Sequence, residues 1–135
     1  MKRASFYLPV IFFAISFILL VLPGNELPKS KLFFNGFDKI VHILLFSVLT
    51  FLFCRPFKLA SANNEVKSKW FVIITLGAII YGALMEFVQL HFVPFRSFEL
   101  GDILADTLGA LSAFIYSRKT FLENKIKKVG PDRNR

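Results

Sequence analysis

Cysteine is almost absent from this chain, which has a single thiol, Cys54, in 135 residues. One cysteine excludes an internal disulfide and any zinc cage built from cysteines. Acidic residues are also scarce, because nine aspartates and glutamates face 17 lysines and arginines and leave a formal net charge of +8. Charge of this sign occurs in nucleic-acid-binding proteins, so the distribution of the basic residues decides whether it serves that purpose here.

Apolar residues are what the chain has in abundance. Hydrophobic residues make up 55% of it, 18 residues are phenylalanine, and the mean hydropathy is +0.57. A domain of this length has too little interior to bury so much apolar surface, so the composition predicts a membrane protein. The long apolar runs lie at residues 6–22, 40–53, 71–90 and 103–116.

These runs predict an all-α fold, a bundle of four transmembrane helices. The second and fourth runs are shorter than the roughly 20 residues that a span requires. Their helices are therefore expected to begin earlier, near Asn35 and near Glu99 or Gly101. The first run follows two basic residues and lacks a cleavage site of small residues, which favours an uncleaved anchor over a signal peptide. Residues 1–117 then form one transmembrane domain, and residues 118–135 a basic cytoplasmic tail.

The basic residues are distributed unevenly around these spans. With the N-terminus inside, 13 of the 17 fall in cytoplasmic segments, and the other four are Lys29, Lys31, Lys39 and Arg96. Lysine and arginine favour the cytoplasmic side of a membrane, so both termini and the segment 55–69 are predicted to be cytoplasmic. Membrane lipids are the partners that this arrangement indicates. Topology accounts for the positive charge, and a nucleic acid partner is not expected.

Polar side chains gather at the ends of three spans that this topology places outside. They form pairs three or four residues apart on a helical face, namely Asp38 with His42, Glu86 with Gln89, and Asp102 with Asp106. Lys39 and Arg96 lie at the same end. A charged side chain at the centre of a membrane helix costs roughly 2.5–3.5 kcal/mol on insertion scales, so such groups normally face the bundle interior and mark a function. These eight residues are the candidate binding site.

Small residues indicate which way two of these helical faces point, because they let membrane helices approach closely. Ala78 and Gly82 lie eight and four residues before Glu86. Gly109 and Ala113 continue the stripe of the acidic pair on the fourth helix. Both acidic stripes are therefore expected to face inward. The pair on the second helix has no such stripe, and its inward position rests on the cost of charge in lipid alone.

Most of the polar residues also have a purely structural interpretation. Asp38 and Asp102 can stabilise helix N-termini through the helix dipole, typically by about 0.3–1 kcal/mol each. His42 taken alone is more often a packing residue than a ligand. Gln89 and Asp106 can hold the bundle together through hydrogen bonds between helices.

Glu86 differs, because it lies near the C-terminal end of its helix, where the dipole disfavours an anion. It needs a partner, and Arg96 or Lys39 is the nearest candidate along the chain. We expect Glu86 and Arg96 to form a partly buried ion pair.

The order of these motifs resembles that of VanZ-like membrane proteins. The resemblance is carried by Asp38-Lys39-Ile40-Val41-His42, Glu86-x-x-Gln89, Arg96 and Asp102-Ile103-x-x-Asp106-x-x-Gly109. It extends from about Asn35 to Ala113. The family usually has asparagine where this chain has Asp106, so this chain carries an extra negative charge in the site.

The resemblance implies a multi-pass protein of the bacterial cytoplasmic membrane. The family is named for a protein associated with low-level resistance to the glycopeptide teicoplanin, which makes glycopeptide resistance an expectation for this chain as well. It implies no catalytic activity and no cofactor.

Our main hypothesis is an envelope protein whose outward-facing polar pocket binds a lipid-linked or headgroup-bearing envelope component. Arg96 and Lys39 would attract phosphate. Glu86, Gln89 and Asp102 would form hydrogen bonds with hydroxyl groups of a sugar or headgroup.

Two alternatives belong to other classes of function. An intramembrane hydrolase or transferase could use His42 as a general base. It could equally bind zinc or manganese through nitrogen and oxygen ligands drawn from His42, Asp38, Glu86, Asp102 and Asp106. The third hypothesis is a structural partner of another membrane protein, in which the polar residues serve assembly alone.

Overall fold

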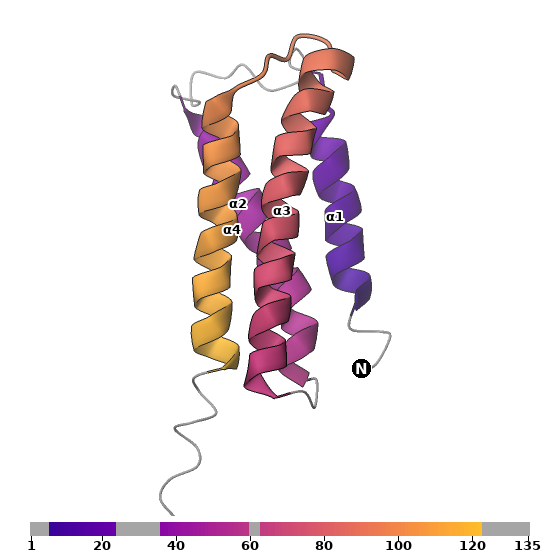
Figure 1. Cartoon of the computed structure of the whole chain (residues 1–135). Coiled ribbons are helices and arrows are strands. Elements are labelled where there is room, and N and C mark those ends of the chain that lie inside the picture. The colour runs from indigo at the N-terminus through magenta and orange to yellow at the C-terminus, as the bar shows by residue number, and fades with distance from the viewer. Residues whose placement is uncertain (1–5, 24–35, 60–62, 123–135) are drawn as a thin grey trace, which may run out of the picture.

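The computed structural model describes residues 6–23, 36–59 and 63–122, and the regular secondary structure within them is all helical (Figure 1). Its α-helices are α1 (Tyr7–Leu20), α2 (Phe37–Cys54), α3 (Asn64–Phe92) and α4 (Leu100–Phe121). A short 3-10 helix, η2 (Arg55–Leu59), extends α2. The prediction of an all-α fold with four helices is confirmed for this part of the chain.

Local sequence explains where the helices begin. Gly36 precedes α2 with a φ of 94°, a left-handed conformation that glycine adopts without steric cost. The side chain of Asn63 accepts a hydrogen bond from the backbone N–H of Val66 at 2.9 Å and so caps α3. This cap lets α3 begin at Asn64, seven residues before the apolar run from which the sequence predicted a span at 71–90.

The four helices alternate in direction, so α1 and α3 end where α2 and α4 begin, at the top of Figure 1. We call this the polar end. The basic segment predicted at 118–135 starts within α4, which continues to Phe121, and residues 123–135 lie outside the described residues.

Close packing of α2 against α4 depends on glycine. A Cβ added at Gly109 would collide with the backbone carbonyl oxygen of Ile43, and Ser47 Oγ donates a hydrogen bond of 3.0 Å to the carbonyl of Gly109. Gly82 on α3 packs in the same way against the side chain of Asp106. The small residues therefore do lie on the faces where the helices meet, as the sequence predicted.

The outward faces of the helices are apolar. Leu44, Ile73, Ile80, Leu104 and Ile115 are each more than half exposed. Two segments of the described chain, Phe37–Phe57 and Asn64–Phe92, are long and apolar enough to cross a membrane, and α1 is a shorter apolar helix. A continuous apolar exterior around a bundle suits a hydrocarbon solvent.

Candidate functional site

Four ionisable side chains from three helices converge inside the polar end. They are His42 from α2, Glu86 from α3, and Asp102 and Asp106 from α4, and each residue is at most 4% exposed. We call them the floor of the site. One ligand atom of each of His42, Glu86 and Asp102 lies within 4.8 Å of the others.

His42 lies between the two aspartates of the floor. Its Nδ1 lies 2.8 Å from Asp106 Oδ1, a hydrogen bond in which the ring N–H donates to the carboxylate. Its Nε2 faces Asp102 Oδ2 at 3.8 Å, too far for a hydrogen bond. Asp106 thus fixes the orientation of the ring and directs the second nitrogen toward the remaining carboxylates of the floor.

Three partly exposed residues surround the floor and form its rim: Asp38, Lys39 and Glu99. The ammonium group of Lys39 contacts Glu99 Oε2 at 2.9 Å and Asp38 Oδ2 at 3.2 Å. It also contacts Asp102 Oδ1 at 3.2 Å, which ties the rim to the floor. An ammonium group has three donors, so these three carboxylates use all of them.

Glu86 and Arg96 do not form the ion pair that the sequence suggested, and that expectation is wrong. Glu86 Oε2 instead accepts a hydrogen bond of 2.9 Å from the backbone N–H of Glu99, at the N-terminus of α4. Arg96 Nε is directed toward the carbonyl oxygen of Leu22 at 3.5 Å, at the end of α1. The buried carboxylate of Glu86 therefore faces the positive end of the α4 helix dipole and not a guanidinium group.

Gln89 also turns away from the floor. Its Nε2 donates a hydrogen bond of 2.9 Å to the carbonyl oxygen of Leu20, which fastens α3 to the end of α1. A second link between these helices, a hydrogen bond of 3.2 Å between the hydroxyls of Ser16 and Tyr81, was not predicted from the sequence. Polar residues on apolar helices thus hold α1 in place.

The structure consequently divides the eight predicted site residues. Asp38, Lys39, His42, Glu86, Asp102 and Asp106 come together. Gln89 and Arg96 contact the end of α1 instead. Glu99 joins the site although the sequence did not place it there. The available signal was its position three residues before Asp102, where it is the N-cap residue of α4.

The charge balance of the site is negative. Within the described residues its floor and rim hold five carboxyl groups against one lysine and one histidine. Both cations that were expected to attract phosphate, Lys39 and Arg96, already have protein partners. The site therefore suits a cation, an amino group or hydroxyl groups better than an unaccompanied anion.

Fold and site together define a bundle of apolar helices that buries an acidic cluster with one histidine at one end. A model of the VanZ/LLP1 family matches residues 4–122, most of the chain. The chain belongs to this family, as the motifs in its sequence suggested. Comparisons with curated proteins and with solved structures find no match.

Proposed function

We propose that this protein is a four-span protein of the bacterial cytoplasmic membrane, with both termini inside, whose polar end binds an envelope lipid by its polar headgroup. The headgroup would carry hydroxyl or amino groups, because the site has an excess of carboxylates. The uneven distribution of lysine and arginine supports the orientation.

One observation carries this proposal: four buried ionisable side chains from three helices meet at a partly exposed rim. Helix packing alone does not require them, because replacing a buried ion pair with apolar residues of similar volume is often neutral or stabilising. Ionisable groups inside a membrane bundle are expensive and generally serve a function. The rim also gives the floor contact with the interface, where lipid headgroups lie.

The test is identification of lipids that copurify with the native protein in mild detergent. We expect Glu86→Gln to lose them, because the amide keeps a hydrogen-bond acceptor for Glu99 N–H but removes one charge from the floor. Glu65→Gln is the matched control, since Glu65 lies in the first turn of the same helix at the opposite end. Equal lipid content in wild type and Glu86→Gln would contradict the proposal. The link to teicoplanin is a separate expectation, tested by susceptibility of strains that carry either variant.

A second candidate function, a metal-dependent hydrolase or transferase acting on such a lipid, is favoured by the geometry of His42. A metal-bound histidine almost always donates its other ring N–H to a carboxylate or carbonyl, and His42 has that arrangement with Asp106. Its Nε2, Glu86 and Asp102 then offer nitrogen and oxygen ligands suited to zinc or manganese. A bound metal would supply an activated water and would balance the carboxylates.

Metal content of the purified protein tests this second function. We expect a divalent cation in stoichiometric amount in wild type and its loss in His42→Ala. His91→Ala is the control, because His91 is exposed and lies beside the carbonyl of Phe87 and the ring of Phe92, away from the floor. A protein without bound metal after dialysis against zinc and manganese would refute the metal-dependent function and leave the lipid-binding proposal standing.

A further inference from the structure

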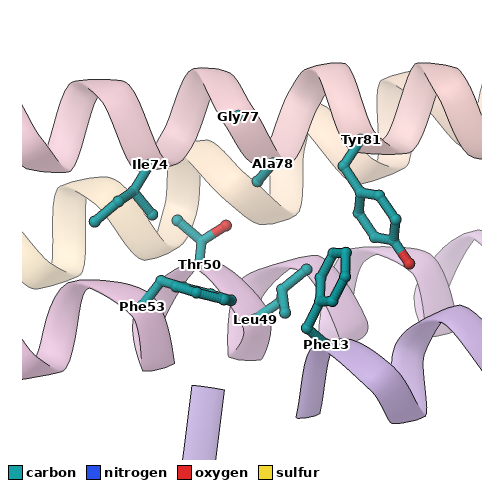
Figure 2. Close-up of a pocket in the computed structure, with 8 residues that line it drawn as sticks. All are labelled: Phe13, Leu49, Thr50, Phe53, Ile74, Gly77, Ala78 and Tyr81. Atoms are coloured by element: carbon teal, nitrogen blue, oxygen red, sulfur yellow. The ribbon is translucent and has the colours of Figure 1, made fainter. Parts of the chain in front are cut away.

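A cavity separate from the polar site lies between α1, α2 and α3 (Figure 2). Its volume is about 210 Å³. Leu49 and Phe53 of α2 and Ile74 and Ala78 of α3 supply much of its apolar lining, and Phe13 of α1 closes one side. An apolar cavity of roughly 150 Å³ already stays dry and binds a molecule the size of benzene. This cavity is therefore large enough for a stretch of hydrocarbon.

Thr50 contributes a polar group to the lining of this cavity. Its side chain points from α2 toward α3 in Figure 2, it is fully buried, and its hydroxyl has no hydrogen-bond partner among the described residues. Thr75 and Thr107 behave differently, because each donates to the carbonyl oxygen four residues earlier. A water molecule needs two to four polar partners, and the hydroxyl of Tyr81, the other polar group of the lining, is engaged with Ser16. Water is a poor occupant of this cavity.

The cavity opens toward the surface that faces lipid. Gly77 lines it and is exposed, and a Cβ added there would meet nothing within 4 Å. Phe13, on the opposite wall, is 40% exposed. An apolar chain can thus enter sideways from the bilayer without passing through the polar end.

The depth of the cavity matches that of a lipid chain. Gly77 lies nine residues before Glu86 on α3, which is about 14 Å along the helix axis. The hydrocarbon region of one leaflet, which is half of the bilayer core, is about 15 Å thick. A lipid whose headgroup lies at the polar end therefore has its chain at the level of Gly77.

We propose that this cavity holds a segment of the hydrocarbon chain, acyl or isoprenoid, of the membrane lipid bound at the polar end. The inference rests on the proposed lipid-binding function for the position of the headgroup, and on the cavity itself for the chain. It assigns Gly77 a role in keeping the cavity open, because any larger side chain there would occupy the space of the chain.

Photocrosslinking in nanodiscs tests the inference. One arm uses phosphatidylglycerol with a diazirine in the middle of its acyl chain, and the other a polyprenyl phosphate with a diazirine in its chain. We expect one probe to label Phe53 or Ile74 in wild type well above the lipid-facing residues of α4. The probe that does so identifies the class of chain.

Gly77→Met should abolish that labelling while leaving the unfolding temperature unchanged or higher, since methionine fills open space. Ser112→Met, on an exposed face of α4, is the matched control and should change nothing. Thr50→Val is close to isosteric and should retain labelling, because the occupant is apolar.

Labelling of the cavity no stronger than that of α4 would overturn the inference, as would labelling that survives Gly77→Met. Loss of labelling in Thr50→Val would also overturn it, since the occupant would then depend on a hydrogen bond. The proposed function fails separately: if Glu86→Gln retains the copurified lipid while the cavity is labelled, the chain site stands and the headgroup site does not.

Discussion

Substitution of Gly109 by alanine gives the most direct test of how the helices pack. The added Cβ would collide with the backbone carbonyl oxygen of Ile43 on the facing helix. A backbone atom cannot rotate away as a side chain does, so α2 and α4 must separate. Separation also stretches the hydrogen bond of 3.0 Å from Ser47 Oγ to the carbonyl of Gly109.

The expected magnitude follows from three contributions. Overpacking a well-packed contact typically costs about 1–3 kcal/mol. A hydrogen bond between membrane helices contributes on average about 0.6 kcal/mol. Alanine is favoured over glycine in a helix by roughly 0.8–1.0 kcal/mol, which offsets part of the loss. The free energy of unfolding should therefore fall by about 1–3 kcal/mol in Gly109→Ala.

Thermal or denaturant unfolding in detergent micelles measures the effect, with two glycines of α3 for comparison. Gly77→Ala meets nothing within 4 Å and should be neutral or more stable by up to about 1 kcal/mol. Gly82→Ala meets the side chain of Asp106, which can move, so its loss should be smaller than that of Gly109→Ala but should disturb His42. If Gly109→Ala and Gly77→Ala had the same stability, the close approach of α2 and α4 would be refuted.

Three further predictions concern the ends of the bundle. Glu86→Gln and Arg96→Ala should lower the free energy of unfolding additively, to within about 0.5 kcal/mol, because the two residues have different partners. Recovery of stability in the double variant would instead show that the two residues do form an ion pair. Gln89→Leu should speed hydrogen exchange in α1 while leaving α4 unchanged, since it removes the bond to Leu20; unchanged exchange in α1 would show that this bond is dispensable. Reporter fusions at Asn64 and at the C-terminus should both read cytoplasmic, and opposite readings would reject the proposed orientation.

Small residues made the inward face of α3 predictable from sequence. Gly82 lies one turn before Glu86, and the structure shows it against Asp106. The pattern works because spacing along a helix fixes direction around its axis, and only glycine allows so close an approach. His42 had no such stripe, yet the cost of charge in hydrocarbon was sufficient reason to expect it inside, where the structure has it.

The hydrogen-bond partners of the polar side chains were less predictable, because they depend on rotation around the helix axis and on the path of the loops, and not on spacing along the sequence alone. Gln89 follows Glu86 by three residues, which turns its side chain by about 60° around the axis. That rotation is enough to direct it to Leu20. Arg96 is ten residues from Glu86 along the chain, but the intervening turn passes through Phe95 with a positive φ of 59°. No rule based on neighbouring positions predicts where a long side chain points after such a turn.

The excess of carboxylates favours the proposed binding role over a purely structural one. A cluster that only holds helices together gains from equal numbers of opposite charges, since each unpaired buried charge loses hydration. Lys39 uses its donors on one floor carboxylate and two rim carboxylates. Among the described residues, Glu86 is faced only by the backbone N–H of Glu99 and by the more distant His42. The floor therefore has more negative charge than its own cations balance. On the proposed function, a cationic or hydroxyl-rich ligand would balance this excess of carboxylates, and the free energy of unfolding should then rise with the logarithm of the ligand concentration.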